Sequence, residues 1–324
     1  MFGAGRCARV IGPGLTGLAA GYGADLLFAD PRHGHPVAVF GRAAAALEQH
    51  SYADGRAAGA WHTAALVGAV AVAGAAAERL ARRAGPWGVA ATLAASTFVA
   101  LGGTTLVRTG DRMAAHLAAG DLAAARALLP SLCGRDPHSL DADGLARAAL
   151  ESVAENTSDA AVAPLLWAAL GGVPGVLAYR AVNTLDAMIG HRSPRYRRFG
   201  WAAARLDDLA NYLPARVTAA LAALCAPLVG GSPREALRAW RRDAARHPSP
   251  NAGVAEAAFA GALGVRLGGP TRYAYRLEIR PTLGDGPAPS VADLRRATRL
   301  SRAVQAAATV TAALLTASLR CRGR

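Results

Sequence analysis

The stretch "ESVAENTSDAAVAPLLWAALGG", residues 151–172, decides the fold. It places three carboxylates, Glu151, Glu155 and Asp159, directly before an uncharged apolar run that extends from residue 160 to residue 179. A helix needs about 20 mostly apolar residues to cross the hydrocarbon core of a bilayer. The run is long enough, so the stretch predicts a transmembrane helix that carries acidic side chains at its end.

Further apolar runs of near-membrane length occur along the chain. Residues 86–107 are also free of charge, and residues 57–77 and 303–319 come close to the required length. Residues 10–28, which contain Asp25, and 213–231, which contain Arg216, are weaker candidates. We therefore expect an all-α, polytopic integral membrane protein that forms one membrane-embedded domain over residues 1–324. A soluble alanine-rich helical bundle is the alternative.

Composition narrows the classes of ligand. All 36 basic residues are arginine, and the net charge of +14 would suit nucleic acid, an anionic membrane surface or phosphorylated ligands. The arginines are scattered between apolar runs and no nucleic-acid-binding motif accompanies them, so we expect no nucleic acid. The cysteines at positions 7, 133, 225 and 321 lack the spacing of a zinc or redox motif and are expected to be apolar fillers.

The polar segments between the runs contain their own helices. Proline and glycine positions predict the following elements. They are a turn and an amphipathic helix over residues 30–52, short helices over 111–155 broken at Pro130 and Pro137, helices over 179–211 around a break at Ser193 and Pro194, a basic helix over 234–246, a loop over 268–289 and a helix from about Val291.

The first constellation of polar residues lies in the opening stretch. Glu151, Glu155 and Asp159 are spaced i, i+4 and i+8, so a helix would place them on one face, beside Ser152 and Asn156. Like charges at this spacing repel, and a cation or a hydrogen-bond donor among them would offset that cost. A solvated helix face is the alternative, although ionisable groups near a membrane are usually functional.

Two further constellations pair carboxylates with carboxamides. Asn183 and Asp186 are one helical turn apart, and His191 follows them. Asp207 or Asp208 shares a helix face with Asn211. Arg205 and Arg216 flank that face. Such oxygen ligands suit Mg²⁺ that also binds substrate phosphates. Hydrogen bonds between helices, or buried Asp–Arg pairs, are the alternative.

A fourth constellation surrounds a proline-rich turn. His247 to Pro250 form a rigid segment, and Asn251 is a plausible N-cap of the helix that follows, whose small residues leave backbone N–H groups open to an anion. Near the start of the chain, Arg32, His33 and His35 are expected to lie in a loop. A contact with phosphate or carboxylate is the second interpretation.

Four stretches together resemble a known family. They are "DPRHGHPVAVFGR" (30–42), "RAALESVAENTSDAAVAPLLWAALGGVPGVLAYRAVNTLDAMIGHR" (147–192), "RYRRFGWAAARLDDLANYLPARVTA" (195–219) and "SPNAGVAEAAFAGALGVRLGG" (249–269). In this order they resemble the CobD/CbiB family of cobalamin biosynthesis, the adenosylcobinamide-phosphate synthases.

The resemblance implies a multi-pass enzyme of the bacterial cell (inner, cytoplasmic) membrane, in contact with membrane lipid. It implies a ligase that joins adenosylcobyric acid to (R)-1-amino-2-propanol, or to its O-2-phosphate, through an amide bond. ATP as co-substrate and Mg²⁺ are implied with it. A partner subunit or a homo-oligomer is also compatible with the sequence.

Spacing and resemblance together yield a set of candidate site residues. They are Glu151, Glu155 and Asp159 for catalysis; Asp186, Asp207 and Asp208 for metal; and Asn156, Asn183, Arg205, Asn211, Arg216, Ser249, Asn251 and His35 for substrate binding.

Two other functions fit part of the pattern. An intramembrane, Mg²⁺-dependent prenyltransferase would also use Asn- and Asp-rich helices, but the Asp ladder here is incomplete. A corrinoid transporter or a scaffold for late-pathway enzymes would need no catalytic residues. Transporters usually show inverted repeats, and the sequence shows none.

Overall fold

The computed structural model describes residues 4–31, 34–191, 193–273 and 276–322, and nearly all of them are helical. The chain divides into two compact units. Unit 1 comprises Met1–Gly102, Ala163–Asn211 and Thr309–Arg324, and unit 2 comprises Gly103–Val162 and Tyr212–Ala308. The all-α prediction is confirmed, while the single-domain prediction stays a prediction.

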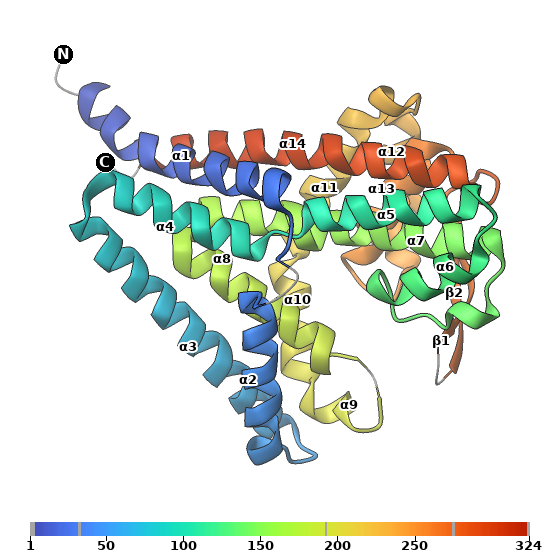
Figure 1. The fold of residues 1–324 in the computed structure, drawn as a ribbon, viewed down its shortest axis with the longest axis horizontal. Coiled ribbons are helices and arrows are strands. Elements are labelled where there is room, and N and C mark those ends of the chain that lie inside the picture. Colours follow the sequence, from blue (N-terminus) through green and yellow to red (C-terminus); the bar gives the residue numbers. More distant parts are fainter. Residues whose placement is uncertain (1–3, 32–33, 192, 274–275, 323–324) are drawn as a thin grey trace. The chain divides into compact units, whose positions relative to one another are not determined.

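Unit 1 is built from long helices and two short ones. They are α1 (Ala4–Phe28), α2 (Pro36–Ser51), α3 (Arg56–Arg83), α4 (Gly85–Ala100), α8 (Ala163–Ile189), α9 (Tyr196–Phe199), α10 (Trp201–Ala210) and the last turns of α14 (Val291–Arg322). In Figure 1, α1 runs beside α4, and these two helices are in contact. The predicted break at Ser193 and Pro194 is confirmed, because it falls between α8 and α9.

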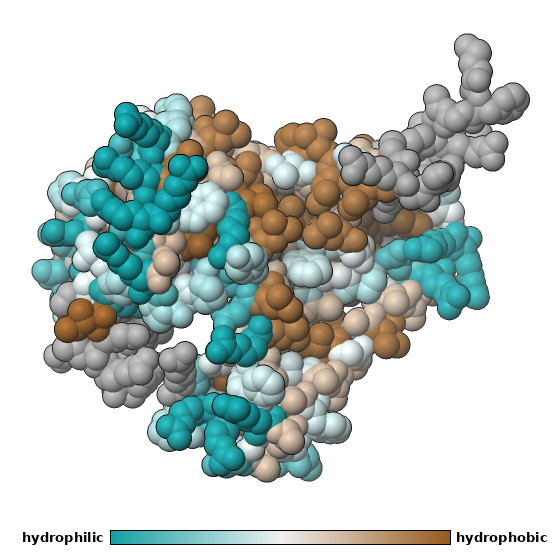
Figure 2. Space-filling view, turned by 180° about the vertical axis from the view of Figure 1, so that it is seen from behind, coloured by the Kyte–Doolittle hydropathy of each residue, from teal (hydrophilic) through white to brown (hydrophobic). Residues whose placement is uncertain are grey.

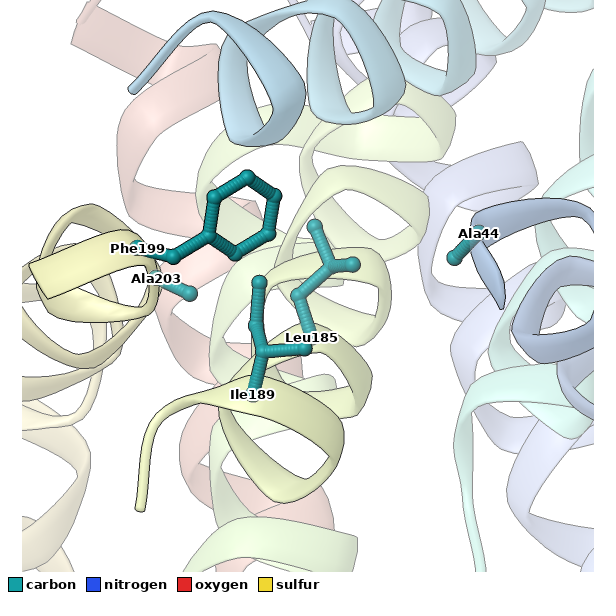
Figure 3. Close-up of a cluster of buried hydrophobic side chains, with 5 residues drawn as sticks. All are labelled: Ala44, Leu185, Ile189, Phe199 and Ala203. Atoms are coloured by element: carbon teal, nitrogen blue, oxygen red, sulfur yellow. The ribbon is translucent and has the colours of Figure 1, made fainter. Parts of the chain in front are cut away.

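One hydrophobic cluster of unit 1 is packed around the aromatic ring of Phe199. Phe199 is fully buried and lies with Leu185 and Ile189 of α8 and Ala203 of α10 (Figure 3). Gly59 of α3 permits this packing, since a Cβ there would lie 1.7 Å from the carbonyl oxygen of Phe199. A glycine is thus required where α3 passes the end of α9.

Helix α8 is broken in its middle. Gly172 has φ 59° and ψ −147°, a conformation essentially confined to glycine, and Pro174 follows it. The backbone N–H of Val173, freed by the break, donates to Oε2 of Glu78 on α3 at 3.1 Å. The predicted span over residues 160–179 lies within Ala142–Ile189, which is long and apolar enough to cross a membrane. Glycine and proline interrupt its hydrogen-bond ladder, and a neighbouring carboxylate caps the second half.

Unit 2 combines helices, short turns and one hairpin. Its elements are α5 (Gly103–Ala118), α6 (Leu122–Leu128), α7 (Ala142–Thr157), a π-helical segment (Ser158–Val162), α11 (Tyr212–Cys225), α12 (Pro233–Asp243), α13 (Ala252–Leu263), β1 (Leu267–Tyr273), β2 (Arg276–Leu283), the first part of α14, and 3₁₀ turns at Leu129–Ser131, Pro137–Ser139, Ala226–Val229 and Ala244–Arg246. The predicted breaks at Pro130 and Pro137, and the predicted helices near residues 234 and 291, are confirmed.

Part of the predicted loop over residues 268–289 forms an antiparallel hairpin instead. Leu267 pairs with Leu283 and Gly269 with Arg280, with a register irregularity between Leu267 and Gly269. The loop prediction is wrong here because its glycines and prolines flank a run of Thr, Tyr, Leu and Ile, residue types that favour strands.

Side-chain hydrogen bonds fix α14 within unit 2. The hydroxyls of Thr157 on α7 and Ser301 on α14 lie 2.6 Å apart and are buried. Nε2 of Gln305 donates to the carbonyl oxygen of Gly103 at 3.3 Å, where α5 begins. These bonds satisfy polar groups that face the interior of the unit.

Among the described residues, four helical segments are long and apolar enough to cross a membrane, by length and composition. They are Arg56–Arg83, Gly85–Ala118, Ala142–Ile189 and Tyr212–Val229. In the first, only 11% of the apolar window is buried, and Trp61 and Val72 are among its exposed side chains. Hydrophobic surface is exposed over a broad area in Figure 2 (brown). Such surface requires lipid around it, and the polytopic prediction is confirmed.

The remaining predicted spans differ in detail. The predicted helix over residues 86–107 is interrupted between α4 and α5, at Leu101 and Gly102. Residues 10–28 and 303–319 are helical, in α1 and α14, but neither run is among the four segments found in the described residues.

We predict that Gly172→Ala destabilises the protein by about 1–3 kcal/mol, the usual cost of a strained backbone conformation. The new Cβ would also lie 2.6 Å from Oε2 of Glu78. Thermal unfolding in detergent would measure the loss. Gly171→Ala is the matched control, because its Cβ would meet nothing within 4 Å. Equal stability of the two variants would contradict the role given to the break.

Candidate functional site

The acidic face of α7 is neutralised in part by an arginine. Glu151 is 1% exposed and forms a buried ion pair with Arg135, which lies in the segment before α7. The other carboxylate oxygen of Glu151 accepts a hydrogen bond from the backbone N–H of Gly268, at 2.7 Å. The sequence predicted a cation or a donor among these acids, and the structure supplies both.

A second buried carboxylate, Glu256, lies on α13. It is 1% exposed, and neither of its oxygens accepts a hydrogen bond from any described residue. Its Oε1 lies 3.7 Å from Nη1 of Arg280 and 3.9 Å from Nε2 of His247. Helix α13, with 12 residues, is too short to span a membrane.

The surroundings favour the neutral form of Glu256. Burial raises the pKa of Glu256 well above its ordinary value, and the negative charges of Glu151 and Glu155 raise this pKa further. The positive charges of Arg280 and Arg135 act in the opposite direction without cancelling the rise. Glu256 is thus a carboxylate whose affinity for a proton is increased by its position.

These charged side chains form one group, which we call the acid–arginine cluster. Its members among the described residues are Glu151, Glu155, Glu256, Arg135 and Arg280, with His247 at its edge. Glu151 and Glu256 are buried, while Glu155 is half-buried. Glu155 is therefore the carboxylate of the cluster that is most accessible from outside.

Asp159 does not lie on α7 itself. It lies in the π-helical segment Ser158–Val162 that follows α7, where it is half-buried. Its alignment with Glu151 and Glu155 on one face stays a prediction. Asn156 stays on α7, where its Nδ2 donates to the carbonyl oxygen of Ser152 at 3.0 Å.

The fourth constellation brings Arg216 and Asn251 together. Nη1 of Arg216 donates to Oδ1 of Asn251 at 3.2 Å, and its guanidinium stacks on the ring of Tyr212 at 3.4 Å. Ser249 Oγ accepts from the backbone N–H of Ala252 at 3.1 Å. Asn251 occupies the N-cap position of α13, as predicted, but its side chain makes no capping hydrogen bond. Ser249 accepts from the first N–H of the helix, and Oδ1 of Asn251 accepts from Arg216.

Unit 1 contains a separate row of polar contacts. The hydroxyl of Tyr179 donates to Oδ1 of Asn211 at 2.8 Å, and both residues are buried. Nδ2 of Asn183 lies 3.4 Å from Oδ1 of Asp207, and Nη1 of Arg180 lies 3.3 Å from Oδ1 of Asn183. Hydrogen bonds between helices, the alternative to a metal site, thus account for Asn183 and Asn211.

The carboxylates predicted to hold a metal have protein neighbours. Asp208 lies 3.5 Å from the guanidinium of Arg205, one turn away on α10. Asp186 lies against the turn at Gly190. No group of three or more His, Cys, Asp or Glu side chains among the described residues is arranged to hold a metal ion. A role of Asp186, Asp207 and Asp208 in binding Mg²⁺ stays a prediction.

His35 caps a helix. Its Nδ1 accepts from the backbone N–H of Val37 at 3.2 Å, at the start of α2, and its Nε2 lies 3.6 Å from Asp30. Arg32 and His33 lie outside the described residues. The loop interpretation of His35 is confirmed, and contact with a substrate stays a prediction.

The candidate residues are distributed over both units. Unit 1 holds His35, Asn183, Asp186, Arg205, Asp207, Asp208 and Asn211, and unit 2 holds Glu151, Glu155, Asn156, Asp159, Arg216, Ser249 and Asn251. Sequence analysis gave no role to Arg135, Glu256 and Arg280. Glu256 had a usable signal, since it is the only charged residue in the apolar run of α13.

The fold and the cluster define a polytopic helical membrane protein with a buried ionic site. The sequence profile described as "CobD/Cbib protein" matches residues 18–301. The chain therefore belongs to the CobD/Cbib family. No solved structure gives a significant match.

Curated relatives from several bacteria carry one name, "Cobalamin biosynthesis protein CobD". The relative from Mycobacterium tuberculosis strain H37Rv is 68% identical over 300 residues, covering 93% of this chain and 95% of the relative. The relative from Geobacter metallireducens is 43% identical over 300 residues, covering 91% and 94%. The relative from Rhodobacter capsulatus is 52% identical over 204 residues, covering 63% and 64%.

We predict that Arg135→Ala destabilises the protein by about 3–5 kcal/mol, because it leaves the buried charge of Glu151 unpaired. Denaturant unfolding in detergent would measure the change. Arg302→Ala is the control, since Arg302 pairs with Asp111 at the surface and its removal should cost no more than about 1 kcal/mol. Similar losses in both variants would contradict the importance of the buried pair.

Proposed function

We propose that the chain is an ATP-dependent acid–amine ligase of late cobalamin biosynthesis. It joins adenosylcobyric acid to (R)-1-amino-2-propanol, or to its O-2-phosphate, and yields adenosylcobinamide or its phosphate. Family membership and the shared name of the relatives support the biosynthetic role. Neither prenyl transfer nor corrinoid transport is favoured by these findings.

The chemistry requires an activated carboxyl group. A carboxylate resists attack by an amine, so the γ-phosphoryl group of ATP is transferred to the carboxylate oxygen, giving an acyl phosphate and ADP. The amine nitrogen then forms the C–N bond as the C–O bond to phosphate breaks. ATP would enter as its Mg²⁺ complex, so Mg²⁺ accompanies the co-substrate.

The acid–arginine cluster is the observation that carries the proposal. Its carboxylates suit the positively charged amine, and its arginines suit the anions that form during acyl transfer. Glu155, the half-buried member, is placed to meet a substrate. Arg216, already oriented by Asn251 and Tyr212, is our candidate for binding phosphate.

The setting also suits the substrates. A large corrinoid offers apolar surface that can rest on a membrane protein, while the small amine arrives from water. We propose the bacterial cell membrane as the location, given the four segments able to span a bilayer. A partner subunit or a second copy of the chain stays a prediction.

The direct test is product analysis. Purified protein would be incubated with adenosylcobyric acid, ATP, Mg²⁺ and each amine, and the products identified by mass spectrometry. We expect the amide product together with ADP and phosphate. Absence of product with both amines, in protein shown to be folded and in lipid, would contradict the proposal.

We predict that Glu155→Gln lowers kcat/KM for the amine by about 10–100-fold, the usual cost of losing a hydrogen bond to a charged group, because a neutral amide attracts the cation less well than a carboxylate. Asp143→Asn, on the exposed first turn of the same helix, is the matched control and should keep full activity. Full activity in a folded Glu155→Gln variant would remove Glu155 from the site. Full activity in a folded Asp208→Asn variant would likewise contradict the predicted role of Asp208 in binding metal.

A further inference from the structure

The carboxylate of Glu256 has a position that needs an explanation. Buried polar groups are nearly always hydrogen-bonded, and a buried charge without such bonds is expensive. Glu256 is 1% exposed, yet neither of its oxygens accepts a hydrogen bond from a described residue. Arg280 and His247 approach one oxygen only, at 3.7 and 3.9 Å, beyond hydrogen-bonding distance.

The charges of the named cluster members do not balance when Glu256 is ionised. With all three carboxylates ionised and His247 neutral, the two guanidinium groups leave one negative charge in excess among these members. A single positive charge would neutralise the cluster. A divalent ion would need more ligands than the described side chains assemble.

A primary ammonium group matches these requirements. It carries one positive charge and three N–H donors, whereas each oxygen of Glu256 lacks a donor. The amine of the proposed reaction is protonated near neutral pH and must lose a proton before its nitrogen can attack. A site for it therefore needs a carboxylate that binds the cation and then accepts its proton.

We propose that Glu256 binds the ammonium group of the amine substrate and accepts its proton. The inference rests on the proposed ligase function and names the residue that activates the nucleophile. One N–H bond breaks and an O–H bond forms on Glu256, which leaves the nitrogen lone pair free. The nitrogen lone pair forms the C–N bond, and phosphate leaves with the electrons of the broken C–O bond. The second N–H proton that the nitrogen loses is carried away by the phosphate.

Glu155 has a different part in this arrangement. It belongs to the same cluster but is half-buried, whereas Glu256 is buried. Glu155 would attract the cation at the entrance, and Glu256 would hold it inside. Because protonated Glu256 is favoured by its surroundings, the proton can stay there while the nitrogen reacts.

The test compares two nucleophiles in Glu256→Gln, which keeps the size of the side chain. With the aminopropanol substrate, we expect kcat/KM to fall by about 10²–10⁴-fold and the KM for the amine to rise. Hydroxylamine is already neutral near pH 7, so no proton has to be removed before its nitrogen attacks, and the proton that it loses on C–N bond formation leaves with phosphate. With it, the variant should form the hydroxamate and release ADP within a few-fold of the unmodified protein.

Glu235→Gln, on α12 in the same unit, is the matched control and should react normally with both nucleophiles. An equal loss with both nucleophiles in Glu256→Gln would show a structural role and overturn the inference. Unchanged kinetics with the amine would overturn it too. If the unmodified protein formed no product with either nucleophile, the proposed function itself would fail, so the two failures are distinguishable.

Discussion

The ion pair between Arg135 and Glu151 is the interaction on which the site in unit 2 depends. It joins the segment before α7 to α7 itself, and the backbone N–H of Gly268 ties the start of the hairpin to the same carboxylate. Breaking a buried pair is costly, because the remaining charge has no solvent to stabilise it. The segment before α7 and the hairpin that follows 117 residues after Glu151 thereby hold the acidic face of α7 in one position.

Small residues provide the second constraint. A Cβ at Gly261 of α13 would lie 2.3 Å from the carbonyl oxygen of Glu235 on α12, and one at Gly253 would lie 2.3 Å from the Cβ of His247. Gly261 allows α13 to approach α12 closely, and Gly253 allows it to approach the segment at His247, as small residues do between packed helices. Glu256 is buried on α13, and burial raises the pKa of its carboxyl group.

The sequence predicted the helices and spans well, because apolar runs and proline positions depend on local spacing. From the repulsion of like charges it predicted a compensating cation, but as a metal ion or a substrate group. It could not identify Arg135, which has no signal in the proline-broken segment around it. A regular period also could not show the π-helical segment that follows α7 and contains Asp159. Gly172 interrupts a span that composition alone describes as continuous. The sequence missed the residues whose positions depend on tertiary contacts.

The central claim is that the acid–arginine cluster binds the amine. A structure determined by cryo-electron microscopy, in a lipid nanodisc with the aminopropanol substrate bound, would test it most directly. The account predicts the ammonium nitrogen within hydrogen-bonding distance of Glu256, between α7 and α13. An amine bound instead beside Asn183, Asp186 and Asp207, with the cluster unchanged and empty, would contradict it.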